Sequence, residues 1–160
     1  MFRLFGGGKT INQTMHKFGY PDTVVMESDH WCVLLRQEQV TLGCLVLICK
    51  ENVERFSDIS GDAFQEYPKI IREIENTLNK LFNYDKINYL MLMMVDPNVH
   101  FHIIPRYSKL KEFENMRFND YGWPSIPVLS KHQRMKRNLF ISLRDFIRVE
   151  WLNGQRESQD

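Results

Sequence analysis

The chain has 160 residues and a formal net charge of +1, with 43% hydrophobic and 26% charged residues. This length predicts one domain that can bury a core of its own, and this composition excludes a largely disordered chain. The nearly balanced charge favours neither nucleic acid nor an anionic membrane surface, and no apolar run approaches the roughly 18 residues that a membrane span requires.

The first 22 residues carry no clear periodic pattern, and we expect them to form a flexible N-terminal segment. Within this segment, Gly8-Lys9-Thr10 is similar to the end of a phosphate-binding loop. That motif also requires an earlier glycine, where Arg3 stands, and a preceding strand, so no such loop is predicted. A single domain is expected over residues 23–152, followed by a polar tail over residues 153–160.

Stretches rich in β-branched and aromatic residues predict the strands of this domain. They cover residues 23–27, 31–36, 40–49, 87–95 and 98–107. A central helix is predicted to begin at Asp62, where Gln65 completes a capping box, or near Tyr67, because Pro68 interrupts the helical pattern. A second helix is predicted over residues 130–151. These elements predict an α+β fold in which a mainly antiparallel sheet of about five strands carries a central and a C-terminal helix.

The three cysteines, Cys32, Cys44 and Cys49, lie in apolar stretches without the spacing of a metal or redox motif. Buried thiols are therefore favoured, and they imply a reducing compartment. Because the N-terminus also lacks the apolar segment of a signal peptide, we expect the protein to be cytoplasmic.

The strand over residues 98–107 is the stretch of the chain most informative about chemistry. In it, Asn98, His100 and His102 alternate with apolar residues, and Pro105 ends the pattern. Side chains two positions apart on a strand point to the same face, roughly 7 Å from each other. The amide and the two imidazoles are therefore expected to share one surface of the sheet.

Three roles fit two histidines in this arrangement. A histidine on a strand is often only a half-buried, hydrogen-bonded residue of the structure. His-x-His on a strand can also offer two ligands to zinc. However, the remaining histidines, His16, His30 and His132, have no supporting spacing, and no carboxylate stands beside the pair. We therefore predict neither a metal nor a cofactor.

The role that we favour is nucleophilic attack on phosphorus. Imidazole is largely neutral at pH 7, and its unprotonated nitrogen attacks without a strong base. The nitrogen–phosphorus bond that forms is labile enough for water or another acceptor to break it in a second step. A polar side chain on the same face can hold a phosphoryl oxygen or pass a proton to the leaving group.

The stretch His100-Phe101-His102-Ile103-Ile104-Pro105-Arg106 resembles the signature of the histidine triad superfamily, His-x-His-x-His followed by two apolar residues. Residues 43–50 resemble the family's Gly-His-Val-Leu-Val-Ile-Pro-Lys strand. Residues 53–59 resemble the loop before its central helix, most closely in the fragile histidine triad branch, whose members hydrolyse dinucleoside polyphosphates. The resemblance covers residues 24–107, in the order and spacing of the family.

The resemblance implies a five-stranded antiparallel sheet, usually in a homodimer. It also implies hydrolysis or transfer of nucleoside monophosphates from dinucleoside polyphosphates, phosphoramidates or nucleotide sugars, through a nucleotidyl-histidine intermediate. The family's nucleophile falls on His100 and its third histidine on His102. The first position of the triad is degenerate, because it holds Asn98, which forms hydrogen bonds but carries no proton charge.

The surroundings of the triad also depart from the family. Asp96-Pro97 stands where family hydrolases have a glycine-rich phosphate loop, and Cys44 stands where the family usually has a histidine. Arg36 occupies the position of an Asn or Asp that receives ribose hydroxyls, and an arginine there can bind a phosphate or a carboxylate. Lys50 and Arg106, at strand ends, are further candidates for neutralising a phosphate.

The C-terminal helix carries a group of basic residues. They are Lys131, Arg134, Lys136, Arg137, Arg144 and Arg148. A solvated helix face explains them better than nucleic acid or a polyphosphate tail. The sequence as a whole predicts a nucleotide hydrolase or transferase with His100 as nucleophile and His102 and Asn98 in support. The alternative is a non-catalytic nucleotide-binding or regulatory protein on the same fold.

Overall fold

The computed structural model describes residues 11–159, so the Gly-Lys-Thr stretch of residues 8–10 lies outside the described residues. The elements are α1 (Gln13–Lys17), β1 (Val24–Glu27), β2 (Trp31–Leu35), β3 (Glu38–Gln39), β4 (Leu45–Cys49), the 3-10 turn η1 (Phe56–Asp58), α2 (Gly61–Phe82), β5 (Lys86–Leu90), β6 (His100–Arg106), β7 (Lys111–Phe113), β8 (Met116–Phe118), β9 (Gln133–Arg134) and α3 (Arg137–Glu157).

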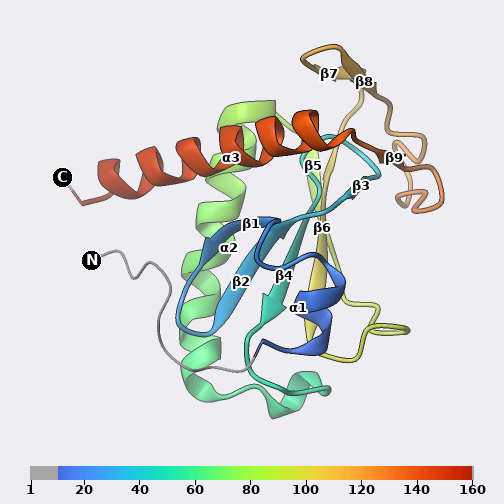
Figure 1. Ribbon diagram of the computed structural model, residues 1–160. Coiled ribbons are helices and arrows are strands. Elements are labelled where there is room, and N and C mark those ends of the chain that lie inside the picture. The colour runs from blue at the N-terminus through green and yellow to red at the C-terminus, as the bar shows by residue number, and fades with distance from the viewer. Residues whose placement is uncertain (1–10, 160) are drawn as a thin grey trace.

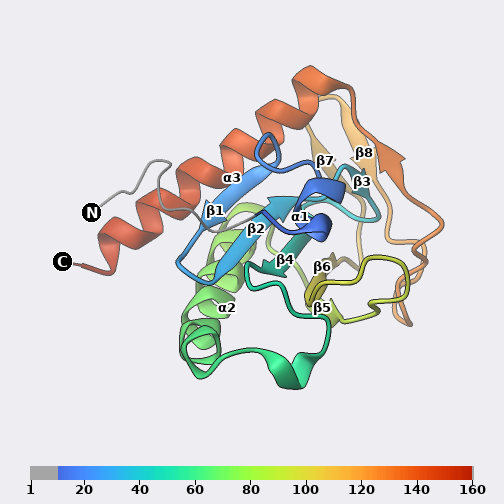
Figure 2. The same ribbon diagram turned by 60° about the horizontal axis from the view of Figure 1, so that its bottom comes forward.

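The main sheet has five strands in the order β1-β2-β4-β6-β5, and every neighbouring pair is antiparallel. The predicted α+β fold is therefore confirmed. Helix α2 packs on one face of the sheet together with α3, and α1 lies on the opposite face (Figures 1 and 2). Because β2 and β4 are buried on both faces, their sequences read as nearly continuous apolar runs, whereas β6 is equally buried but carries His100 and His102.

Helix α2 begins at Gly61, one residue before the predicted capping residue Asp62. Ser60 is the N-cap, and its side chain accepts a hydrogen bond from the backbone N–H of Ala63. Pro68 lies inside the helix without ending it. A proline removes one helical hydrogen bond, but the apolar face of α2, with Ile70 and Ile74 buried against the sheet, stabilises the helix through the core.

The expected boundaries of the domain are wrong at both ends. Residues 11–22 contain α1, whose N-cap Asn12 accepts a hydrogen bond from the backbone N–H of Met15. Met15 is buried against the sheet, so this stretch belongs to the domain. Helix α3 begins at Arg137, because the residues before it include β9, which pairs with β3. It then continues to Glu157, into the expected polar tail.

The sequence also predicted buried thiols and the absence of a membrane span. Cys32, Cys44 and Cys49 are buried thiols, which is the predicted state. Within residues 11–159, no helix combines the length and the apolar character needed to cross a bilayer.

Candidate functional site

His100 and His102 lie on the face of the sheet that α1 covers, which we call the histidine face. In the register of the three central strands, His100 stands opposite Ile48 and His102 opposite Val46. Met15 of α1 packs over Val46 and Ile48. The ring of Phe18, just after α1, lies 5.8 Å from each imidazole, centroid to centroid. The alternation of strand β6 thus brings both predicted histidines together, and α1 closes over them.

The imidazole of His100 is held by the backbone of its own strand. Its Nδ1 lies 2.7 Å from the carbonyl oxygen of Asn98, and the residue is 1% exposed. A carbonyl oxygen only accepts hydrogen bonds, so Nδ1 must carry the proton of this contact. In the neutral ring Nε2 then keeps its lone pair. Nε2 is therefore the nitrogen of His100 that can act as a nucleophile.

His102 lies beside His100, with 5.0 Å between the ring centroids. Burial of the ring lowers the pKa of His102 to about 4, with smaller contributions from the positive charge of Arg36 and from His100. At pH 7 the ring is therefore neutral, with one N–H donor and one acceptor nitrogen. Its Nδ1 is buried and has no hydrogen-bond partner among the described residues.

Asn98 uses its side chain to attach α1 to the sheet. Its Oδ1 accepts hydrogen bonds from the backbone N–H and the hydroxyl of Thr14, at 3.1 and 3.0 Å. Its Nδ2 donates to Oδ1 of Asn52 at 2.9 Å. Both polar atoms of the amide are therefore hydrogen-bonded within the protein, and Asn98 contacts His100 through its backbone carbonyl. Asn98 therefore orients the ring of His100 through its backbone and holds α1 over that ring through its side chain.

Asn98→Ala is expected to lower the free energy of unfolding by about 2 kcal/mol, because it leaves the buried donors of Thr14 without an acceptor. Urea denaturation measures this loss. Asn52→Ala is the matched control, since it removes only the exposed partner of the same amide and should cost less than about 1 kcal/mol. Equal losses in the two variants would contradict the attachment of α1 by Asn98.

Arg36 follows β2 and lies next to the start of β4. Its backbone N–H donates to the carbonyl of Cys44 at 3.0 Å, which places it beyond Val46 on the histidine face. Its Nη1 is buried and has no hydrogen-bond partner among the described residues. The guanidinium influences the pKa of His102, so the structure brings this predicted binding residue close to the histidine pair.

Cys44 does not present its thiol to a ligand. The side chain is fully buried with Val40 and Ile104, and its Sγ lies 3.4 Å from both the backbone nitrogen and the hydroxyl oxygen of Thr41. Burial raises the pKa of the Cys44 thiol, so it remains protonated. That Cys44 binds substrate stays a prediction, and the structure does not favour it, because this position belongs to the apolar core under the site.

Lys50 and Arg106 are occupied by protein groups. Lys50 Nζ donates to the carbonyl of Ser28 at 3.0 Å and pairs with Glu27 at 3.2 Å. Arg106 is buried and pairs through Nε with Asp120 at 2.7 Å. Their role in neutralising a substrate phosphate stays a prediction, and the structure does not favour it, because each cation already has a carboxylate partner distant from it in sequence.

A family model described as the HIT domain matches residues 17–109, which is more than half of the chain. The chain belongs to the HIT domain family. The match includes the histidine strand, Arg36 and the central helix. No curated protein matches the chain.

Solved structures of other HIT proteins are similar to this one. A histidine triad protein from Marinobacter aquaeolei VT8 is 18% identical, with a TM-score of 0.69 over 92% of this chain and 98% of that chain. A hypothetical histidine triad nucleotide-binding protein from Sulfolobus tokodaii is 19% identical, with a TM-score of 0.64 over 84% and 87% of the two chains. A zinc-bound histidine triad family protein from Mycobacterium smegmatis is 14% identical, with a TM-score of 0.61 over 92% and 94%. These identities establish the shared fold.

Sequence reasoning missed the residues of this HIT domain that come from α1. Thr14, Met15 and Phe18 all contact the histidine strand or its neighbours. One signal was available in the sequence: Asn12 is a strong N-cap residue three positions before Met15. A helix of five residues is too short to show a periodic pattern, and its contacts with β6 span more than 80 positions of sequence.

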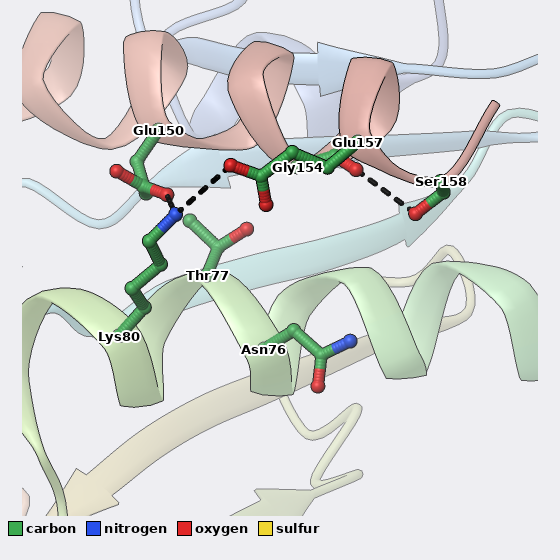
Figure 3. Close-up of a pocket in the computed structure, with 7 residues that line it drawn as sticks. All are labelled: Asn76, Thr77, Lys80, Glu150, Gly154, Glu157 and Ser158. Carbon is green, nitrogen blue, oxygen red and sulfur yellow. Dashed lines mark hydrogen bonds and ion pairs between the residues drawn. The ribbon is translucent and has the colours of Figure 1, made fainter. Parts of the chain in front are cut away.

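One cavity lies beside α1, lined by Ile11, Asn12, Gln13 and Asn52, and Asn52 accepts a hydrogen bond from Asn98. Another, of about 290 Å³, opens between α2 and α3 (Figure 3). Its lining consists of Asn76, Thr77, Lys80, Glu150, Gly154, Glu157 and Ser158. The amine of Lys80 already pairs with Glu150 at 2.7 Å and Glu157 at 3.6 Å, so no unpaired charge points into this cavity. Within residues 11–159, no cluster of three His, Cys, Asp or Glu side chains is arranged to hold a metal.

Proposed function

We propose that this HIT protein hydrolyses or transfers nucleotides from a phosphate anhydride or phosphoramidate, with dinucleoside polyphosphates as the model substrate. The observation that carries the proposal is the contact of His100 Nδ1 with the carbonyl of Asn98. It leaves Nε2 as the nitrogen with a lone pair on the histidine face. The resemblance of residues 53–59 to the fragile histidine triad branch supports the choice of substrate.

In the first step, Nε2 of His100 attacks the phosphorus of the nucleotide, and a nitrogen–phosphorus bond forms. The bond between phosphorus and the leaving group breaks, and its electron pair leaves with that group. In the second step, the oxygen of water or of another acceptor attacks the phosphorus. The nitrogen–phosphorus electron pair returns to Nε2, and the proton of the acceptor passes to solvent.

His102 supports this chemistry as a neutral group. Because its pKa is about 4, an imidazolium is not the resting form at pH 7, and the ring has a single N–H with which it can donate a hydrogen bond to one phosphate oxygen of the substrate. Asn98 supports it through the carbonyl that orients His100. Substrate entry requires the ring of Phe18 to move, because both imidazoles lie beneath it.

A non-catalytic nucleotide-binding protein is the second candidate. It is favoured by one observation: His100 is 1% exposed, so the nucleophile is covered in the ligand-free chain. Binding in such a protein would use the same face without a covalent step.

A panel of diadenosine polyphosphates, adenosine phosphoramidate and nucleotide sugars separates the two candidates. We expect turnover of at least one member and, in protein stopped during turnover under mildly alkaline conditions, the added mass of a nucleotidyl group on the peptide that contains His100. Nucleotide binding without turnover of any member would support the non-catalytic candidate and overturn the enzymatic one.

We further propose that the protein forms a homodimer through β5. Strand β5 is an open edge of the sheet, whereas the other edge strand, β1, contacts α3 (Figure 1). Edge strands exposed in this way pair readily with another chain. The segment after β5 also exposes apolar side chains, with Met94 at 86% and Val95 at 82% exposure. A second copy would cover both features.

Sedimentation velocity is expected to show twice the mass of a single chain. Met94→Lys should shift the protein toward the monomer, because it places a charge in the proposed interface. Ile126→Lys is the matched control, since Ile126 is also an exposed apolar side chain but lies in the segment between β8 and β9. A monomer at all concentrations, or equal behaviour of the two variants, would contradict the proposed dimer.

A further inference from the structure

Two buried side-chain polar atoms lack a hydrogen-bond partner among the described residues. They are Nη1 of Arg36 and Nδ1 of His102. Leaving such a group without a partner costs free energy, so folded proteins pair nearly all of them. Both unpaired atoms belong to the histidine face, beside the proposed nucleophile.

The register of the strands relates the two residues. His102 stands opposite Val46 on β4, and Arg36 donates its backbone N–H to the carbonyl of Cys44, which comes just before β4 and two positions before Val46. Arg36 and His102 are therefore offset by roughly 7 Å along the strands and, because β4 lies between β2 and β6, by about 10 Å across the sheet. The long side chain of Arg36 spans part of this distance, and its charge acts on the ring of His102.

The charge of Arg36 is also not neutralised by any ion pair within residues 11–159. Arg106, Arg117, Arg144 and Arg148 each pair with a carboxylate. No carboxylate among the described residues forms such a pair with Arg36. A half-buried guanidinium without an anion, next to an imidazole with an unpaired nitrogen, is a site for an anionic ligand.

We infer that Arg36 and His102 bind a second phosphate of the nucleotide, distinct from the phosphate that His100 attacks. This inference rests on the proposed function, since it specifies the substrate of the same site. The substrate class is then a nucleotide with at least two phosphates, the second either on the sugar or further along a polyphosphate chain. A sugar diol is a poorer match, because arginine only donates hydrogen bonds and carries a full charge.

The chemistry of a phosphate suits the two donors. Its oxygens point in tetrahedral directions, so one oxygen can accept from Nη1 of Arg36 and another from the N–H of His102. The neutral state of His102 is compatible with this role, because one ring nitrogen still donates. Charge-assisted hydrogen bonds of this kind are the stronger ones in proteins.

The test measures binding to His100→Ala protein, which does not depend on turnover. Calorimetric titrations compare adenosine monophosphate with adenosine diphosphate and with adenosine 3′,5′-bisphosphate. We expect a second phosphate to tighten binding by about tenfold or more. Tighter binding of the diphosphate would show that the second phosphate is bound along the polyphosphate chain of the nucleotide. Tighter binding of the 3′,5′-bisphosphate would show that it is bound on the sugar.

Arg36→Gln in the same background is expected to abolish the gain while it leaves the affinity for the monophosphate within about threefold. Arg134→Gln is the matched control: Arg134 is an exposed arginine whose partner is Gln37, and the change removes the same charge outside the histidine face. It should keep the gain. Arg36→Gln should also raise the pKa of His102, measured by NMR, which confirms that the variant is folded and that the two groups are close.

Absence of any gain from a second phosphate, including absence of binding by all three ligands, overturns the inference. Equal gains in the Arg36→Gln and Arg134→Gln proteins overturn it as well. Failure of the enzymatic proposal is a separate result, namely no turnover of the substrate panel by the wild-type protein, and it leaves these binding measurements interpretable.

Discussion

Replacing His100 by alanine is expected to lower kcat/KM by about 10⁴-fold or more on any substrate that the panel identifies, because the covalent route has no other nucleophile in the site. Steady-state assays of the purified variant measure this loss. The fold should persist, since His100 contributes its ring to the histidine face and not to the main core between the sheet and α2. The nucleotidyl adduct should disappear in the same variant.

His132→Ala is the control for this experiment. His132 also places Nδ1 against a backbone carbonyl, that of Leu129 at 3.1 Å, but it is exposed and lies away from the sheet. It should retain wild-type activity. Activity retained by His100→Ala, or lost equally in both variants, would mean that the histidine strand does not supply the nucleophile.

Replacing Asp120 by alanine is expected to lower the free energy of unfolding by about 3–5 kcal/mol. Asp120 and Arg106 pair through two contacts of 2.7 and 3.0 Å, and their side chains are only 1% and 4% exposed. Asp120 also accepts from the backbone N–H of Tyr107. Removing its carboxylate therefore leaves a buried guanidinium without its anion, which is costly. Urea denaturation measures the loss.

Glu112→Ala serves as the comparison, because Glu112 pairs with Arg117 at 2.8 Å on the surface and should cost less than about 1 kcal/mol. The double variant Arg106→Met with Asp120→Leu should recover much of the stability, since it removes both charges. A small loss in Asp120→Ala would mean that water reaches Arg106 in solution.

The proposed function and the second-phosphate site depend on the same few residues of the histidine face. In these proposals His100 supplies the reacting nitrogen, His102 a neutral donor, and Arg36 a charge that no carboxylate of residues 11–159 neutralises. The two departures from the family pattern, Asn98 and Arg36, both fit these proposals. Asn98 provides the carbonyl that accepts from Nδ1 of His100, and in the second proposal Arg36 provides the charge that binds a further phosphate.

The sequence by itself determined the fold class and the position of the reactive strand. Alternation of polar and apolar residues in the stretch 98–107 places His100 and His102 on one face whatever surrounds them, because a strand has a period of two. Continuous apolar runs likewise predicted the central strands of the sheet. These are local properties, and sequence patterns report local properties well.

Only the tertiary structure decided which of the candidate cations are available to a ligand. Lys50, Arg106 and Arg36 look alike in the sequence, yet the first two have carboxylate partners in the fold, Glu27 and Asp120, and Arg36 has none among the described residues. The tertiary structure also decided that Phe18 covers the site and that Asn98 attaches α1 to the sheet. The physical reason is the same in each case: these contacts join residues from separate elements, and only the folded chain brings their side chains within hydrogen-bonding or packing distance.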